Sequence, residues 1–239
     1  FVESRRQKTS EKDRKTVQTI LNDVRKNGDS AVKKYERKFN GRKTSQLRVS
    51  AKEIKEARSK ISRDEWDVLT SMSGVLRWDT NEFLSSLPSP RKVERPVGSI
   101  SYTFVPIPSV GCYIPGGQAR YPSSAVMSVI PAKLAGVKRI VVVSPPGRDG
   151  KIDPLTIVAA KMCGATEIYK VGGAQAIGAL TYGTKSIPKV DKIVGPGGKF
   201  VSIAKSLVSD QTAIDMVAGP TELGIIANAS SNPELVALD

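Results

Sequence analysis

Four glycine-rich turns are the parts of this sequence whose residue types and spacing could do chemistry. They read PGGQ at 115–118, GGAQ at 172–175, GPGG at 195–198 and AGPTE at 218–222. Glycine lets the backbone approach a ligand closely, and a helix that starts after such a turn presents free N–H groups to an anion. A single turn of this kind is typical of a tight corner between a strand and a helix. Several on one edge of a sheet indicate a ligand of nucleotide size.

The standard dinucleotide fingerprint is absent. GCYIPGG lacks the G-x-G-x-x-G spacing, and Ser144 ends the next strand where an acid that binds ribose would be expected. A dinucleotide would therefore bind in a nonstandard way, through polar side chains on the turns. The candidates are Tyr113, Gln118, Gln175 and Thr221.

The chain contains no histidine, which removes the commonest general base and the commonest metal ligand. It has no Walker sequence, and its two separated cysteines cannot assemble a metal cluster. We interpret Cys112 and Cys163 as buried core thiols. Asp215 could act as an acid near the ligand edge, or it could equally accept hydrogen bonds from the backbone N–H groups of its turn.

Composition restricts the class of protein. The chain has 239 residues, enough for one large domain or two smaller ones. Its net charge is +14, but the basic residues are dispersed among acids, which favours a solvated surface over a nucleic-acid interface. It has no run of about 18 apolar residues, so no membrane-spanning helix is expected. Two cysteines fit a reducing cytoplasm.

Helical patterns fill the first third of the chain, and we interpret these helices as packing elements. Apolar residues recur at helical spacing before Gly28 and before Gly41, where two helices should end. Capping boxes at 50–53 and 62–65 predict two more helix starts, the second of which continues through residues 68–84.

The pattern changes near Arg91, first to extended segments and turns and then to alternating strands and helices. The predicted strands contain GCYI, RIVVV, EIYKV, VDKIVG, AIDMV and LGIIA. Short apolar strands separated by helices favour a parallel sheet covered on both faces. NPELVALD begins a helix capped by Asn232. The chain lacks an initiator Met and stops inside that helix, so we expect it to be part of a longer protein.

The turns and their flanking sequences together resemble the histidinol dehydrogenase family. VGCYIPGG, SVIPAKLAGVKRIVVVSPP, VGGAQAIGALTYGT, IPKVDKIVGPGGKFV and AIDMVAGPTE occur in the family's order and spacing. The resemblance runs from about Thr16 to Asp239 and includes NDVRKNGDSAVKKYERKF.

The resemblance implies an α/β fold: a Rossmann-like, mostly parallel sheet with flanking helices, preceded by a helical N-terminal segment of a second α/β domain. Residues 1–110 would form the N-terminal helices and the first part of domain 1. Residues 111–221 would form the cofactor-side domain, and 222–239 would return to domain 1. It also implies a cytoplasmic homodimer that uses NAD and zinc to oxidise L-histidinol to L-histidine through the aldehyde, without nucleic acid or membrane.

The family's functional positions fall on few residues of this chain. Tyr113 and Gln175 match positions that contact NAD, and Gly198 stands where the family usually has an Asn that contacts NAD. Thr221 replaces a Ser that contacts substrate and keeps the hydroxyl. On the resemblance, the catalytic Glu-His pair and the zinc ligands follow Asp239. We therefore assign no catalytic or metal-binding residue within the 239 residues and expect this fragment alone to be inactive.

Two other functions stay open on the sequence. A histidine-free paralogue could keep the fold as a nucleotide-binding or interaction module, which Gly198 supports. A nucleic-acid binder would rest on net charge alone. A Gln and a His soon after Asp239 would favour the enzyme over the paralogue.

Overall fold

A computed structural model gives the structure of the chain and describes residues 10–41, 46–116, 120–147, 149–216, 225 and 227–238. The chain divides into two compact units. One comprises Thr9–Val217, and the other comprises Phe1–Lys8 together with Ala218–Asp239. The domain limits expected at residues 110 and 221 stay a prediction.

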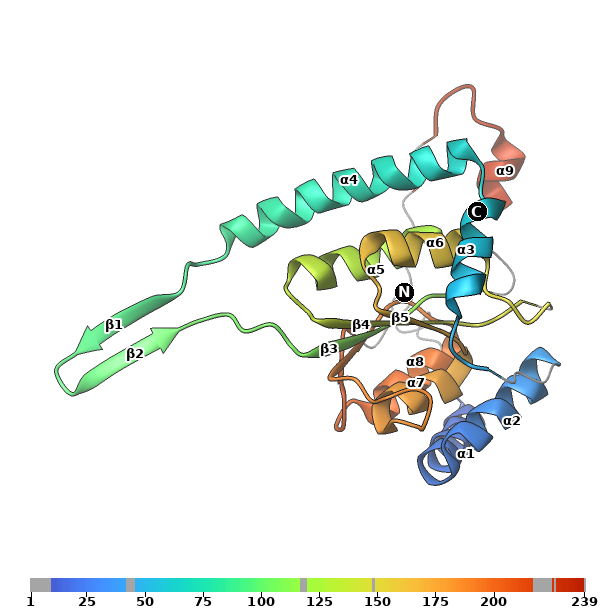
Figure 1. Cartoon of the computed structure of the whole chain (residues 1–239), viewed down its shortest axis with the longest axis horizontal. Helices are drawn as coiled ribbons and strands as arrows, with labels where there is room; N and C mark the ends of the chain where they lie inside the picture. Colours follow the sequence, from blue (N-terminus) through green and yellow to red (C-terminus); the bar gives the residue numbers. More distant parts are fainter. Residues whose placement is uncertain are drawn as a thin grey trace. The chain divides into compact units, whose positions relative to one another are not determined.

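A five-stranded sheet organises the larger unit (Figure 1). Its strands are β3 (Ser109–Tyr113), β4 (Arg139–Ser144), β5 (Glu167–Lys170), β6 (Lys192–Val194) and β7 (Ala213–Ile214). They lie in the order β5-β4-β3-β6-β7, and every neighbouring pair is parallel. The predicted parallel sheet is confirmed. Chain order reverses between β3 and β6, which is where sheets of this kind bind ligands.

Helices cover both faces of the sheet (Figure 1). The helices that follow the strands are α5 (Pro122–Leu134), α6 (Pro154–Cys163), α7 (Gly173–Tyr182) and α8 (Lys199–Val208). On β4, Ile140 and Val142 pack into the core beneath α5 and α6, whereas Val141 and Val143 pack into the core beneath α7 and α8. Side chains of a strand alternate between faces, so a strand buried on both faces needs an unbroken apolar run such as RIVVV.

The N-terminal helices extend these two layers. They are α1 (Glu11–Asn27), α2 (Asp29–Asn40), α3 (Ala51–Lys60) and α4 (Arg63–Ser86). Helices α1 and α2 pack against α7, while α3 and α4 pack against α6 and α5. Both capping boxes predicted from the sequence are present, at the starts of α3 and α4.

A short segment before α3 closes the outer edge of the sheet. Val49 N–H donates to the Ile168 carbonyl at 2.8 Å, and Lys170 N–H donates to the Leu47 carbonyl at 2.7 Å. The Lys170 ammonium also bonds the Glu53 carboxylate at 2.7 Å. The edge strand β5 is therefore paired with residues that lie about a hundred positions earlier in the chain.

An antiparallel hairpin lies between α4 and β3 in the sequence. It consists of β1 (Arg91–Arg95) and β2 (Gly98–Tyr102), and Figure 1 shows it extending away from β3. Its residues are exposed, apart from the half-buried Val93. The extended segments predicted here are confirmed.

The last described helix, α9 (Pro233–Leu238), belongs to the smaller unit. Asn232 Oδ1 accepts from Glu234 N–H at 2.9 Å, so the predicted cap is confirmed. The predicted strand LGIIA falls mostly outside the described residues. Its described members, Ile225 and Ala227, do not lie in a strand.

Candidate functional site

Two glycine-rich turns lie at the carboxyl ends of their strands, as predicted. The turn 172–175 follows β5 and starts α7, and the turn 195–198 follows β6 and starts α8. The turn 218–222 lies outside the described residues, and so does part of 115–118. The candidates Gln118 and Thr221 therefore have no described position.

Tyr113 connects the end of β3 to the start of α7. Its hydroxyl accepts a hydrogen bond from Gly173 N–H at 3.1 Å, and the residue is 5% exposed. Burial raises the pKa of the Tyr113 hydroxyl and the Glu36 charge adds to that effect, while the bond from Gly173 opposes it. The phenol therefore stays protonated at neutral pH and supports the α7 N-terminus.

Gln175 lies in the first turn of α7 and is buried, with 2% of its surface exposed. Its Nε2 donates to Glu36 Oε1 at 2.8 Å. Its Oε1 is also buried and has no hydrogen-bond partner among the described residues. A buried carbonyl without a partner is costly, so this atom suits a ligand that brings a donor.

A hollow of about 240 Å³ adjoins this carboxamide, and we call it the α7 hollow. Its lining includes Ile20, Phe39, Pro145, Gly173, Gln175 and Phe200. The lining comes from α1, α2, the start of α7, the start of α8 and the turn after β4. Mostly apolar walls with few polar groups are typical of small-molecule sites. Gln175, a residue predicted from the sequence, is one of those that line the α7 hollow.

Asp215 holds the turn that follows β6. Its carboxylate accepts from Gly195 N–H at 2.8 Å and from Met216 N–H at 2.7 Å, and it forms an ion pair with Lys205. Burial acts to raise the pKa of Asp215, but the bonds from Lys205, Met216 and Gly195 outweigh it, so the pKa lies below its usual value. These contacts support the second of the two interpretations of Asp215, a residue that holds its turn.

Gly198 precedes α8 and has open space beside it. Its φ of −67° and ψ of 177° suit any residue. A Cβ added there would meet no heavy atom of the described chain within 4 Å. Phe200, which follows shortly after, lines the α7 hollow. The assignment of Tyr113, Gln175 and Gly198 as NAD contacts stays a prediction.

A second hollow, of about 280 Å³, lies where β3 and β4 end. Its lining includes Ser144 and Arg120. Arg120 is engaged by Glu65 at 3.1 Å and by Asp153 at 3.0 Å. Asp153 also caps α6 by accepting from Leu155 N–H at 3.0 Å. An anion that bound here would compete with two carboxylates. Those of Glu65 and Asp153 already pair with the Arg120 guanidinium, and that of Asp153 also caps the N-terminus of α6.

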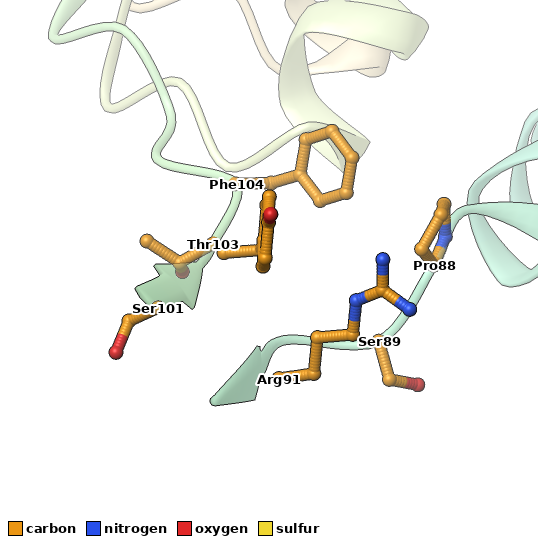
Figure 2. A pocket seen from close by; sticks show the side chains of 7 residues that line it. Pro88, Ser89, Arg91, Ser101, Thr103 and Phe104 are labelled. Carbon is orange, nitrogen blue, oxygen red and sulfur yellow. The ribbon is translucent and has the colours of Figure 1, made fainter. Parts of the chain in front are cut away.

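A third hollow, of about 390 Å³, lies at the base of the hairpin. Figure 2 shows the Arg91 guanidinium and the Phe104 ring on its walls, with Pro88 beside them. Its lining comes from the segment between α4 and β1, from the hairpin strands and from the residues after β2, and it includes none of the predicted site residues.

Both cysteines of the chain lie in its core. Cys112 and Cys163 are both fully buried, which confirms their interpretation as core residues. Burial raises the pKa of the Cys112 thiol to about 12.

Among the described residues, no group of three or more His, Cys, Asp or Glu side chains could hold a metal ion. A search of the same residues finds no helix both long and apolar enough to cross a membrane.

Glu36 is the site residue that sequence reasoning missed. It is fully buried, and its Oε1 accepts both from Gln175 Nε2 and from Gly172 N–H, at 2.8 and 2.9 Å. One signal could have found it. Glu36 lies one helical turn after Val32 and next to Tyr35, so it places a charge on the apolar stripe of α2.

Comparison with known proteins gives a consistent result. A profile of the family described as histidinol dehydrogenase matches residues 3–239. Histidinol dehydrogenase of Bacillus licheniformis is 44% identical over 231 residues, and the match covers 96% of this chain and 54% of the relative. The enzyme of that name from Methanococcus maripaludis is 46% identical over 225 residues, which covers 94% of this chain and 52% of the relative.

A solved structure agrees with the sequence matches. The crystal structure of histidinol dehydrogenase from Elizabethkingia anophelis aligns with a TM-score of 0.85 and 36% identity. That alignment covers 96% of this chain and 53% of the other. The chain thus spans about half the length of the curated relatives it matches.

Proposed function

This chain belongs to the histidinol dehydrogenase family, and we propose that it supplies the NAD-binding part of an enzyme that oxidises L-histidinol to L-histidine through the aldehyde. NAD, when bound, would accept the hydride that each oxidation step releases. The residues assigned to NAD are Tyr113, Gln175 and Gly198, and Thr221 is assigned to the substrate. The proposal also places the enzyme in the cytoplasm and makes it a homodimer, on family resemblance.

The observation that carries the NAD assignment is the buried carboxamide of Gln175 beside the α7 hollow. Its carbonyl oxygen has no partner among the described residues, and apolar walls surround the space next to it. Tyr113 supports the same helix start through its bond from Gly173. All of this lies at the carboxyl edge of a parallel sheet, the usual place for a nucleotide.

Zinc does not fit the described residues, because they contain no cluster of potential ligands. The zinc part of the proposal rests on family resemblance alone. The chain also contains no histidine, so it cannot supply an imidazole base. We therefore expect the 239 residues by themselves to show no histidinol oxidation.

The test compares this chain with a polypeptide of full family length that contains it. Calorimetric titration of NAD should give binding to both, whereas NADH production from histidinol should occur only with the longer polypeptide. Turnover by the short chain would contradict the proposal. If the longer polypeptide binds NAD but neither oxidises histidinol nor binds zinc, the result would instead favour a nucleotide-binding paralogue.

A further inference from the structure

A buried carboxylate occupies the N-terminus of α7. Glu36 reaches it from α2, and the single atom Oε1 accepts from Gly172 N–H at 2.9 Å and from Gln175 Nε2 at 2.8 Å. Gly172 is the N-cap of α7, and Gln175 lies in its first turn. The carboxylate thus stands where an anionic ligand of a helix N-terminus would stand.

This contact fixes the orientation of the Gln175 carboxamide. A carboxylate can only accept, so the amide must turn its Nε2 toward Glu36 and its Oε1 away. Gln175 Oε1 lies on the side of Gly173, 2.9 Å from the position that a Cβ on that glycine would take. What Gln175 can still offer to a ligand is therefore an acceptor.

The same contact removes donors from the turn. Helix N-termini bind phosphate through free N–H groups, but here Gly172 N–H is used by Glu36 and Gly173 N–H by the Tyr113 hydroxyl. A phosphate at GGAQ would have to displace a fully buried side chain. This turn is poorly suited to the phosphate role that its glycines suggest.

The walls of the α7 hollow favour a flat apolar group. Ile20, Phe39 and Phe200 contribute apolar surface, and the volume of about 240 Å³ is small for a whole dinucleotide. An aromatic base would fill such a space and could donate an N–H to the free carbonyl of Gln175.

We propose that Glu36 is a positioning residue that orients the Gln175 carboxamide and keeps phosphate off the start of α7, so that the α7 hollow takes an uncharged planar ring with an N–H donor, such as adenine. The identification of that ring with one end of NAD rests on the proposed function. The role of Glu36 itself does not.

The test titrates the ¹⁵N-labelled chain with adenosine and, separately, with inorganic pyrophosphate. Adenosine should shift the side-chain amide signals of Gln175, whereas pyrophosphate should leave the backbone signals of Gly172 and Gly173 unchanged. In Glu36→Met, adenosine affinity should fall about tenfold because the amide is free to rotate. Pyrophosphate should then shift the signal of Gly172, whose N–H Glu36 no longer holds.

Glu36→Gln is the matched control. Its carbonyl oxygen can accept both hydrogen bonds, so adenosine affinity should stay within about twofold of the parent. If Glu36→Met does not fold, Gln175→Met replaces it. That variant removes the acceptor but leaves Glu36 on Gly172. Its adenosine affinity, followed through the backbone signals of α7, should fall about tenfold, and pyrophosphate should leave the Gly172 signal unchanged.

Two results would overturn the inference: Gln175 signals that do not respond to adenosine in the parent chain, or Glu36→Met with parental adenosine affinity and no pyrophosphate response. These outcomes are separable from a failure of the proposed function. NAD affinity that is the same in the parent and in Glu36→Met contradicts only the inference. Adenosine binding that depends on Glu36, in a protein that does not bind NAD, contradicts only the proposed function.

Discussion

The ammonium group of Lys205 and the carboxylate of Asp215 form an ion pair across the turn that follows β6. Both partners also bond the backbone of Gly195: Lys205 Nζ donates to its carbonyl at 3.1 Å, and Asp215 accepts from its N–H at 2.8 Å. The pair therefore fixes the first glycine of the GPGG turn from two sides.

Asp215→Ala should destabilise the chain by about 3 kcal/mol. The substitution leaves the Lys205 ammonium buried without its anion. Because the Asp215 side chain is 29% exposed in the parent, we expect a cost at the lower end of the range for a buried ion pair. Lys205→Met should cost less, because the carboxylate keeps its two backbone donors. Urea unfolding of both single variants and of the double variant measures the coupling. Additive effects would show that the pair contributes nothing.

The Asp215 contribution should depend on pH in one direction. The folded-state pKa of Asp215 lies below its ordinary value of 3.8. Its stabilisation is therefore complete above that value and is lost as the pH falls through the lower folded-state pKa. The stability difference between the parent and Asp215→Asn should shrink between about pH 5 and pH 2. Urea midpoints over that range provide the measurement, and a difference that grows on acidification would contradict it.

The two ends of the GPGG turn should respond differently to alanine. Gly195 has φ +108°, and a Cβ there would lie 2.2 Å from the Tyr113 carbonyl oxygen. Gly195→Ala should therefore cost several kcal/mol or prevent folding, because the obstacle is backbone. Gly198→Ala enters open space and should cost less than about 1 kcal/mol, through weaker capping of α8. Thermal unfolding of the two variants is the comparison.

Gly198→Asn should tighten NAD binding, measured by titration of a polypeptide of full family length. The backbone accepts Asn without strain, and the amide could contact the cofactor while also capping α8, which adds at most about 1 kcal/mol of stability. Gly198→Ala is the control that adds a Cβ without an amide. Equal affinities in all three proteins would mean that position 198 does not contact NAD.

Both cysteines should be unreactive in the folded chain. Cys112 has a pKa raised to about 12 by burial, and Cys163 is equally inaccessible. Since the thiolate is the reactive form, an aromatic disulfide reagent should label neither residue until urea unfolds the protein, when both should react. Rapid labelling of Cys112 under native conditions would contradict the burial of β3.

Local patterns are sufficient to predict the helix starts and the strands of the parallel sheet. Capping boxes, terminal glycines and unbroken apolar strands each act within a few residues, so the helix starts and the parallel sheet could be read from sequence. The pairing of β1 with β2 was not predicted. Both faces of these strands are exposed apart from the half-buried Val93, so burial does not select a register, and only extended structure is expected there.

The candidate site was predicted in part. The glycine turns pointed to Gln175 and Gly198, because their carboxyl-edge position follows from the α/β pattern. Glu36 contacts Gln175 across 139 positions of sequence, and no local signal specifies such a partner. Phe39 and Phe200, which line the α7 hollow, could not be paired from the sequence for the same reason. They lie on α2 and α8, which only tertiary folding brings together.

The contact between Leu47 and β5 joins an early part of the chain to one that is synthesised much later. The N-terminal helices leave the ribosome long before the strand and the helix against which they pack, because Glu53 and its partner Lys170 are 117 positions apart. Until α7 is made, the apolar stripes of α1 and α2 lack the helix against which they pack, and exposed stripes of this kind attract chaperones and other nascent chains. Slower translation of the residues between α2 and the end of α7 should therefore lengthen the period in which the newborn protein can aggregate.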